Sequence, residues 1–462
     1  MAVYCLLFTA YCLLFKMQVT TDKIITESAA LETIEKAIAQ SQSEGVFISL
    51  SSSESILSRF SENQISQNVH KNRFNLTVTS YFGKKSASAS TTELDQDAIT
   101  AALRRAEELA QFAPEDPEWV ELLPPQSYED RKPAFDPALI NFSPLDRGEI
   151  VQQVCNQARN SGVEGSGTLS SNISLMAIGN SAGLRAAQQG TDTSFSFTAR
   201  QDNGSSWSQL TASDMASLPI LETTQKTIDR AIASRHPQAI APGDYSVIFE
   251  PQAMASLLPW VVWNLDARAA DEGRSFMSRS DDSGSVGNRV GEQLFSPLVQ
   301  VQRNPAHPLL RSGIFFGDGL PNSHLDIINN GIPQTLSYSR YWAQQQSKQP
   351  TGSFYPIVMT GGDKTTAELI AETAKGILVT RAWYVRYVNP RTLEVTGMTR
   401  DGTFLIENGK IVCPIKNLRF NQSLPEMLNN VTAVGQVQRC GSSVIPACKV
   451  DNFHFSSVTD SV

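Results

Sequence analysis

Seven prolines fall within residues 113–145, and they set the first limit on how this 462-residue chain can fold. Proline fixes φ and has no backbone N–H, so it is disfavoured inside helices and in central strands. We therefore expect residues 113–145 to be a Pro-rich linker or an extended wrap between folded regions. A second break is expected at residues 237–243, which begin with proline and end with glycine. The sequence thus predicts α+β subdomains at residues 17–112 and 146–240 and a C-terminal domain at residues 241–462.

Both N-terminal units combine helical and strand-like hydrophobic patterns. Apolar residues recur at helical spacing in residues 28–41, 92–112, 146–160 and 222–235. Thr92 is the expected N-cap of the second of these helices, with Asp95 as its capping-box partner. Strands are expected at residues 46–50, 56–60, 74–82, 173–178 and 194–200.

The C-terminal region is richer in strand patterns. A strand over residues 245–250 and an apolar-rich helix over residues 253–270 open it. Asn408 and Gly409 stand between two apolar runs, which is a strong signal for a two-residue hairpin turn. Further strands are expected at residues 378–388 and 449–455. The predicted fold class is therefore α+β, with an N-terminal α/β-mixed region followed by a β-rich C-terminal domain.

Charge and cysteine content limit the class of function. The chain has 38 basic and 46 acidic side chains, whereas a dedicated nucleic-acid binder normally shows a basic face. Its six cysteines include no Cys-x-x-Cys pair and are too few for a disulfide scaffold. We therefore expect a reducing, cytoplasmic location, no nucleic-acid partner and no small-molecule cofactor.

The first sixteen residues form an apolar extension in which YCLLF occurs twice. The apolar run stops at Lys16 and is shorter than the roughly 20 residues that a membrane helix needs. It also lacks the preceding basic residues of a secretory signal. We expect a dispensable extension, with Met17 as the true initiator, and no stable membrane association.

Candidate catalytic motifs are few. None of the five histidines has a second histidine or a cysteine within five residues, so no His-Glu-x-x-His zinc motif exists. Residues 179–183 fit the pattern G-x-S-x-G, which would make Ser181 a nucleophile. The residues after Ser181 form a poor helix, and no HGGG-type oxyanion segment occurs, so we expect a strand followed by a tight turn. No catalytic residue is assigned to this chain.

Several segments, taken in order, resemble the TldD/PmbA family, which is known as modulators of DNA gyrase or microcin-processing peptidases. The resemblance covers roughly residues 28–460. The segments are SRFSENQI at residues 58–65, ISLMAIGNSAGL at 173–184, GRSF at 273–276, FFGDGLP at 315–321, NNGIPQTLSYSRYWA at 329–343, TGS at 351–353, FLIENGKIVCPI at 404–415 and VIPACKVDNFHFSS at 444–457.

The family consists of paired subunits, and its TldD-type subunit carries His-Glu-x-x-x-His on a helix, a later cysteine, and zinc. In this chain the corresponding helix positions hold Pro259, Trp260 and Asn264, and Cys440 corresponds to the later cysteine. Proline and tryptophan cannot bind zinc, and nothing replaces the general-base glutamate. The resemblance therefore implies a PmbA/TldE-type subunit with a degenerate zinc helix, no metal site and no catalytic residue of its own.

The expected function is that of a pseudoenzyme subunit in a zinc metallopeptidase complex that degrades or processes unfolded peptides. The resemblance implies a heterodimer in which a TldD-type homologue holds the zinc, while this chain helps to hold an extended peptide. Phe316, Asp318 and Gly319 are expected in a loop that lines the peptide chamber. Two alternatives remain open: a stand-alone peptide-binding protein without hydrolysis, and an independent hydrolase that uses Ser181.

Overall fold

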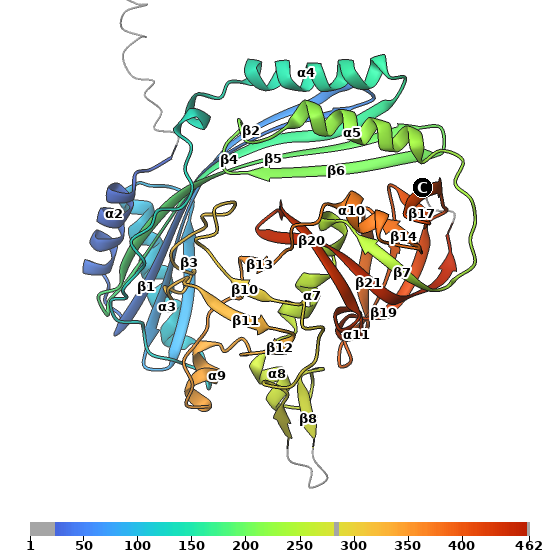
Figure 1. The fold of residues 1–462 in the computed structure, drawn as a ribbon. Coiled ribbons are helices and arrows are strands. Elements are labelled where there is room, and N and C mark those ends of the chain that lie inside the picture. Colours follow the sequence, from blue (N-terminus) through green and yellow to red (C-terminus); the bar gives the residue numbers. More distant parts are fainter. Residues whose placement is uncertain (1–23, 281–285, 460–462) are drawn as a thin grey trace, which may run out of the picture.

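The computed structural model describes residues 24–280 and 286–459, so the expected extension over residues 1–16 lies outside the described residues. Within these ranges no helix is both long and apolar enough to cross a membrane. The chain combines helices with sheets throughout, and its C-terminal region consists mainly of strands (Figure 1). The predicted α+β class is therefore confirmed.

A six-stranded antiparallel sheet is built from strands on both sides of the Pro-rich segment, in the order β3-β2-β1-β4-β5-β6. The bounds of its strands are β1 Gly45–Ser61, β2 Gln64–Phe82, β3 Lys85–Thr91, β4 Glu164–Asn180, β5 Arg185–Gln201 and β6 Gly204–Ala212. The sheet is long and curves over the C-terminal domain (Figure 1). β6 is the sheet edge that lies nearest to that domain in this view.

Four helices cover the outer face of this sheet. They are α2 Glu27–Ala39, α3 Gln96–Phe112, α4 Pro144–Asn160 and α5 Ile220–Ala233, and a 3-10 turn, η1, spans Pro137–Asn141. Apolar residues of α2 and α3 form one buried cluster with β1, β2 and β4. Those of α4 and α5 form a second buried cluster with β4 and β5. The alternation of apolar residues along the strands places both clusters on one face of the sheet.

The C-terminal domain is organised around a mixed sheet of thirteen strands. Their bounds are β7 Gly243–Phe249, β10 Val301–Arg303, β11 Leu325–Asn329, β12 Ile332–Pro333, β13 Ile357–Met359, β14 Lys375–Val379, β15 Ala382–Asn389, β16 Glu394–Thr399, β17 Thr403–Glu407, β18 Lys410–Pro414, β19 Leu418–Ser423, β20 Val431–Cys440 and β21 Ser443–Val458. β8 Ser278–Ser280 and β9 Val286–Asn288 form a separate pair. β21 lies at the centre, because it pairs with β7, β13, β19 and β20.

Short helices complete this domain. They are α6 Pro251–Met254, α7 Leu258–Trp263, α8 Ala267–Asp271, α9 Arg340–Gln345, α10 Thr366–Ala371 and α11 Leu424–Asn429. The largest buried cluster among the described residues joins α6, α7 and α11 to β7 and β21. This core fixes the position of α7, which carries Pro259 and Trp260, two of the positions expected in a degenerate zinc helix.

Four expectations about local structure were wrong. The single strand expected over residues 378–388 is divided between β14 and β15, because these two strands pair with different neighbours. Residues 46–50 and 56–60 are not separate strands but parts of β1, because the serine-rich stretch between them is paired with β2 on one side and β4 on the other. Asp95, not Thr92, caps α3, since its side chain accepts a hydrogen bond from the backbone N–H of Ala98. Residues 253–270 form parts of three short helices, because Pro259 lies in the first turn of α7, where it interrupts a continuous helix, and Asp266 caps α8.

Candidate functional site

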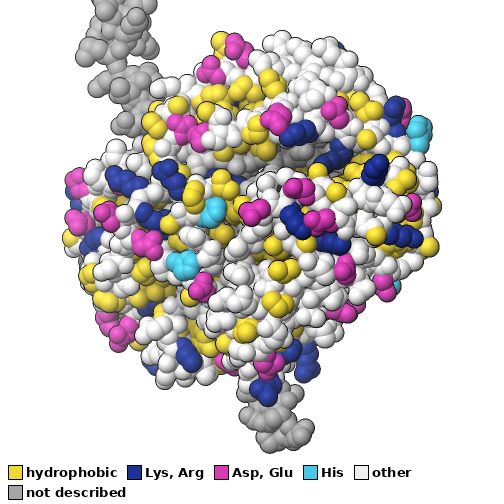
Figure 2. Space-filling view, viewed as in Figure 1, with side chains coloured by type: hydrophobic (Ala, Val, Ile, Leu, Met, Phe, Trp, Pro, Cys, Tyr) yellow, Lys and Arg dark blue, Asp and Glu magenta, His cyan; other side chains and the backbone are white. Residues whose placement is uncertain are grey.

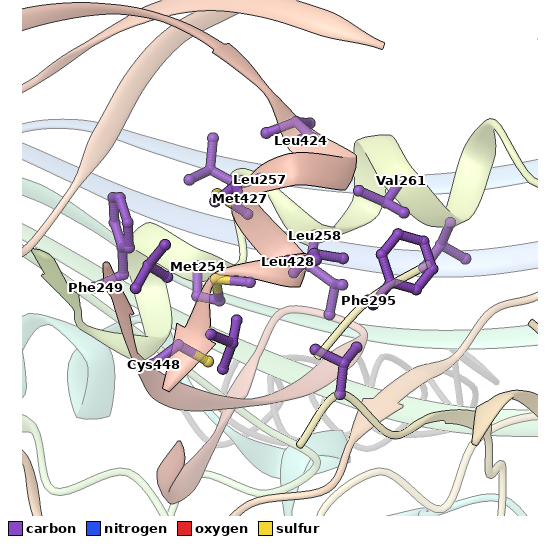
Figure 3. Close-up of a cluster of buried hydrophobic side chains, with 14 of the residues drawn as sticks. Phe249, Met254, Leu257, Leu258, Val261, Phe295, Leu424, Met427, Leu428 and Cys448 are labelled. Carbon is purple, nitrogen blue, oxygen red and sulfur yellow. The ribbon is translucent and has the colours of Figure 1, made fainter. Parts of the chain in front are cut away.

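Pro259, Trp260 and Asn264, the positions expected to form a degenerate zinc helix, lie on and just after α7. Pro259 occupies its first turn, where the missing N–H is not needed for an intrahelical hydrogen bond. Leu258, on the buried side of α7, faces α11 in the main core (Figure 3). Trp260 and Asn264 are half-buried, and the Trp263 side chain is 55% exposed. The polar and aromatic side of α7 is therefore accessible from solvent.

Four aromatic rings gather over this side of α7, and we call Trp260, Trp263, Tyr355 and Tyr387 the aromatic cluster. The Trp260 and Tyr387 rings meet edge to face at a centroid distance of 4.7 Å. Trp263 lies 5.8 Å from Trp260 and 6.3 Å from Tyr355. Asn264 joins the cluster, because its Nδ2 donates to the Tyr387 hydroxyl at 2.8 Å and to the Trp260 carbonyl at 2.7 Å. α7 and β15 thus share one aromatic surface.

This arrangement does not fit a zinc ion. Zinc in proteins is bound by imidazole, thiolate or carboxylate groups, and Pro259 and Trp260 offer none of these. Asn264 turns its amide nitrogen toward the cluster as a donor. Over residues 24–280 and 286–459, no three His, Cys, Asp or Glu side chains come together in a group that could hold a metal ion. We therefore derive no chemical step through a metal in this chain.

Cys440, which the resemblance was expected to align with the family's later cysteine, lies at the end of β20 and is paired with Ser443 across the β20–β21 turn. Its side chain is buried. Burial raises the pKa of the thiol to about 12, so Cys440 remains protonated at neutral pH. Because the thiolate is the form that binds metals and attacks substrates, this thiol is suited to packing rather than to chemistry.

The loop that holds Phe316, Asp318 and Gly319 packs against the six-stranded sheet rather than against α7. The Gly319 carbonyl accepts a hydrogen bond from the Tyr128 hydroxyl at 2.9 Å. Gly319 has φ +97°, and a Cβ at this position would lie 2.5 Å from Leu184 Cδ2. The Asp318 carboxylate accepts a hydrogen bond from a backbone N–H inside the loop. These contacts make the loop a joint between the sheet and the C-terminal domain.

Ser181 lies in the turn between β4 and β5. Its Oγ accepts a hydrogen bond from the Val46 N–H at 3.0 Å, and its own N–H donates to the Val46 carbonyl at 2.9 Å. The segment that follows is the strand β5 and not the helix of a nucleophile elbow. The expected strand and tight turn are confirmed, and the Ser181 hydroxyl is held by the backbone of β1.

A second group of stacked arginine and aromatic side chains lies on β15, on Arg381 just before it and on Trp207 of β6, and sequence reasoning missed it. The Arg381 guanidinium lies 4.0 Å from the Trp207 ring centroid and 4.3 Å from that of Trp383. Arg386 lies 4.0 Å above Tyr384, whose φ of +56° is unusual for a bulky residue. The available signal was the run AWYVRYV at residues 382–388, which places large aromatic residues on both faces of one strand.

Charge does not single out a ligand on the visible surface. On the face in Figure 2, acidic and basic side chains are interspersed, and neither sign forms a continuous field. Arginine, tyrosine and tryptophan together are typical of surfaces that bind other polypeptides. The α7 and β15 surface therefore has the composition of a polypeptide-binding site.

Models of one protein family match nearly all of the described chain. The PmbA/TldA metallopeptidase domain 1 matches residues 46–110, the central domain matches residues 128–235, and the C-terminal domain matches residues 242–457. The three matches follow one another in the order of the family's own domains.

Comparison with individual proteins gives the same result. The chain is 24% identical to the metalloprotease PmbA of Escherichia coli O157:H7 over 468 residues, which covers 94% of this chain and 97% of the relative. Its fold is similar to that of TldE from Thermococcus kodakarensis, with a TM-score of 0.83 at 18% identity over 92% of this chain and 100% of the other. A protein of Bacteroides thetaiotaomicron, described as a modulator of DNA gyrase, gives a TM-score of 0.81 at 20% identity over 93% and 98% of the two chains.

Proposed function

The chain belongs to the PmbA/TldD metallopeptidase family, and from this premise we propose that it is the metal-free, PmbA/TldE-type subunit of a zinc peptidase complex. A TldD-type homologue would supply the metal site and the general base. This chain would complete the complex and help to hold an unfolded peptide. The proposal assigns no bond-breaking step to any residue of this chain.

The aromatic cluster over α7 is the observation that carries this proposal. Four rings and Asn264 occupy the place where the resemblance puts the zinc helix. Ring faces and edges provide apolar and stacking contacts, but they supply neither a Lewis acid nor a proton acceptor. On this proposal, a surface suited to binding polypeptide side chains takes the place of the enzyme site in this chain.

The test compares this chain alone with this chain mixed with a His-Glu-x-x-x-His homologue from the same source. Zinc content is measured on each sample, and cleavage of a fluorescein-labelled unfolded peptide is followed with and without a chelator. A partner in which glutamine replaces the motif's glutamate serves as the matched control, because it keeps the zinc ligands and loses the general base.

We expect no zinc and no cleavage with this chain alone, and chelator-sensitive cleavage in the mixture. Zinc binding together with cleavage by the purified chain alone would refute the proposal. Peptide binding without cleavage in either sample would replace it with a stand-alone peptide-binding function.

A further inference from the structure

A pocket of about 460 Å³ opens beside the ends of β10 and β11, on the side of the C-terminal domain that carries α9. Its described lining includes Arg303, Lys348 and His324 but no aspartate or glutamate. His324 is paired with Asp326 at 3.2 Å, so the two uncompensated cations of the pocket are Arg303 and Lys348. Because the whole chain has a formal charge of −8, a local excess of positive charge is a specific feature of this place. Such an excess indicates a site for an anion.

Arg303 is a buried charge without a carboxylate partner. It ends β10, and its side chain is 3% exposed. Burial lowers the pKa of the guanidinium to about 10, so Arg303 is still charged at neutral pH. In the part of the chain that the structure describes, it makes no ion pair. Glu129, the carboxylate that acts on it from a distance, is itself paired with Arg131 at 2.7 Å. Since a buried charge is normally paired, Arg303 has room for a negative partner from outside the chain.

Three backbone carbonyls hold the Arg303 guanidinium in place. Its Nε donates to the Ser323 carbonyl at 2.7 Å. Its Nη1 donates to the Thr351 carbonyl at 2.5 Å and to the Ser353 carbonyl at 2.7 Å. The Phe316 ring lies against the guanidinium, with its centroid 5.1 Å from Cζ. The group is therefore fixed in one orientation before any ligand arrives, which reduces the entropy that binding costs.

The remaining nitrogen of Arg303, Nη2, faces the pocket. It makes no hydrogen bond to any residue within 24–280 or 286–459. The planar guanidinium places Nη2 between the N–H groups of Nε and Nη1. Those two groups point to the carbonyls of Ser323 and Thr351, and both of these residues line the pocket together with Arg303. Nη2 is thus a charged donor with two N–H groups to offer to a ligand.

Lys348 supplies a second positive charge at the mouth of the pocket. Its side chain is exposed, and it forms no ion pair with any described residue. Its backbone N–H donates to the Ala343 carbonyl at 2.8 Å, which holds this segment against the end of α9. Because the ammonium group is solvated, it contributes less to binding than the buried guanidinium does.

The surroundings of Arg303 favour a carboxylate over a phosphate. Three carbonyl oxygens already lie around the guanidinium, and they would repel a dianion more strongly than a monoanion. The pocket is larger than a carboxylate group, and part of its wall is apolar. Leu320 is buried there, and Leu325 and Pro350 are half-buried. A ligand with one carboxylate and an apolar portion matches both parts of the pocket.

We propose that this pocket binds an organic carboxylate, with a carboxylate oxygen accepting a hydrogen bond from Arg303 Nη2 and the apolar portion against Leu320 and Leu325. We call it the carboxylate pocket. The inference does not rest on the proposed function, because it concerns this chain by itself. The carboxylate can come from a free organic acid or from the C-terminus of a polypeptide, since both present the same group.

The test uses the full chain and isothermal titration calorimetry. The probe is N-acetyl-leucine, and its control is N-acetyl-leucine amide, which has nearly the same shape and no charge. Both are titrated into the unmodified chain, so this comparison does not depend on the folding of a variant. Lys348→Gln removes the charge at the mouth. Lys410→Gln is its matched control, because it removes an exposed lysine from β18, at the opposite end of the same sheet.

We expect the acid to bind at least about tenfold more tightly than the amide, because a hydrogen bond to a charged group is lost with the amide. Lys348→Gln should weaken binding of the acid about threefold, and Lys410→Gln should change it less than about 1.5-fold. Arg303→Met, if its thermal unfolding shows a folded chain, should abolish the preference for the acid.

Three results would overturn the inference. The first is equal affinity for the acid and the amide. The second is no binding of the acid at roughly 10 mM, a concentration well above the dissociation constant expected for one buried charged contact. The third is tighter binding of inorganic phosphate than of the acid, since the site would then not select a carboxylate.

A second pair of probes identifies the source of the carboxylate. A five-residue peptide that ends in leucine is titrated with a free and with an amidated C-terminus. Tighter binding of the free peptide than of N-acetyl-leucine would support a polypeptide C-terminus as the ligand. Tighter binding of N-acetyl-leucine would support a free organic acid.

Discussion

Replacing Asp401 with alanine should destabilise the junction between the six-stranded sheet and the C-terminal domain. The Asp401 side chain is 2% exposed. It accepts hydrogen bonds from Ser205 Oγ at 3.0 Å and from Arg381 Nη1 at 2.5 Å. Arg381 is itself 15% exposed and is stacked between Trp207 and Trp383. One carboxylate therefore holds together residues from both sides of the junction.

The expected loss of unfolding free energy follows from these contacts. Removing one partner of a buried ion pair costs about 3–5 kcal/mol, because the other charge remains buried and unpaired. Arg381 keeps some exposure and its two aromatic neighbours, so we expect the lower part of that range. Asp401 also has φ +56°, where alanine is less favourable than aspartate by roughly 1 kcal/mol. The total for Asp401→Ala is about 4 kcal/mol.

Urea unfolding monitored by tryptophan fluorescence measures this loss, since Trp207 and Trp383 both flank Arg381. Asp401→Asn is the matched control, because asparagine tolerates the same φ and keeps an acceptor for Ser205. Adding Arg381→Met to Asp401→Ala should restore part of the lost stability, because the more buried of the two arginines paired with Asp401 is then removed; the other, Arg400, lies 3.7 Å from the carboxylate and is 24% exposed. A loss below about 1 kcal/mol for Asp401→Ala, or a double variant less stable than Asp401→Ala, would refute the reasoning.

Three further predictions concern other parts of the molecule. Trp263→Ala should leave the unfolding temperature within about 2 °C of that of the unmodified chain, because the Trp263 side chain is mostly exposed. The same variant should slow peptide cleavage by the mixed complex, and unchanged cleavage would contradict a role for the aromatic cluster. Gly319→Ala should lower the unfolding free energy by about 2–3 kcal/mol in urea titrations, because it places a Cβ 2.5 Å from Leu184 at a residue with positive φ. An unchanged unfolding free energy would mean that the loop can shift. Burial, opposed by Arg439, raises the pKa of Asp192 to about 6, above the value of about 3.9 in an unfolded chain. The folded state then binds the proton more tightly, so stability from this group is present below about pH 4 and is lost as the pH rises to about 6. Asp192→Asn should remove this pH dependence of stability. Between about pH 4 and pH 7 the unfolding free energy of the variant should therefore rise by about 1 kcal/mol relative to that of the unmodified chain, a reduced figure because the Asp192 carboxylate is half exposed. Plots of unfolding free energy against pH with equal shape for both chains would be inconsistent with this.

Local signals in the sequence located several elements well. Asn408 and Gly409 form the turn between β17 and β18, both with positive φ, as the dipeptide predicts. The alternation in residues 74–82 matches the buried Leu76 and Val78 of β2. These features depend on residues within a few positions of one another, so the sequence carries them without knowledge of the fold.

Longer elements were misjudged where pairing partners overrode local pattern. The serine-rich middle of β1 has weak strand propensity, but β2 and β4 supply its backbone hydrogen bonds. β6 was not expected at all, because the polar sequence GSSWSQLTA shows little alternation of apolar and polar residues. Its pairing with β5 decides its structure.

The sequence by itself determined the fold class, the family resemblance and the absence of zinc ligands at Pro259, Trp260 and Asn264, since residue identity alone settles whether a side chain can bind a metal. Only the tertiary structure decided which contacts the side chains at those three positions make. It joined Asn264 to Tyr387, 123 residues away, and it placed Arg303 and Lys348 in one pocket. The physical reason is that strand pairing and side-chain packing depend on long-range register, which no short stretch of sequence encodes.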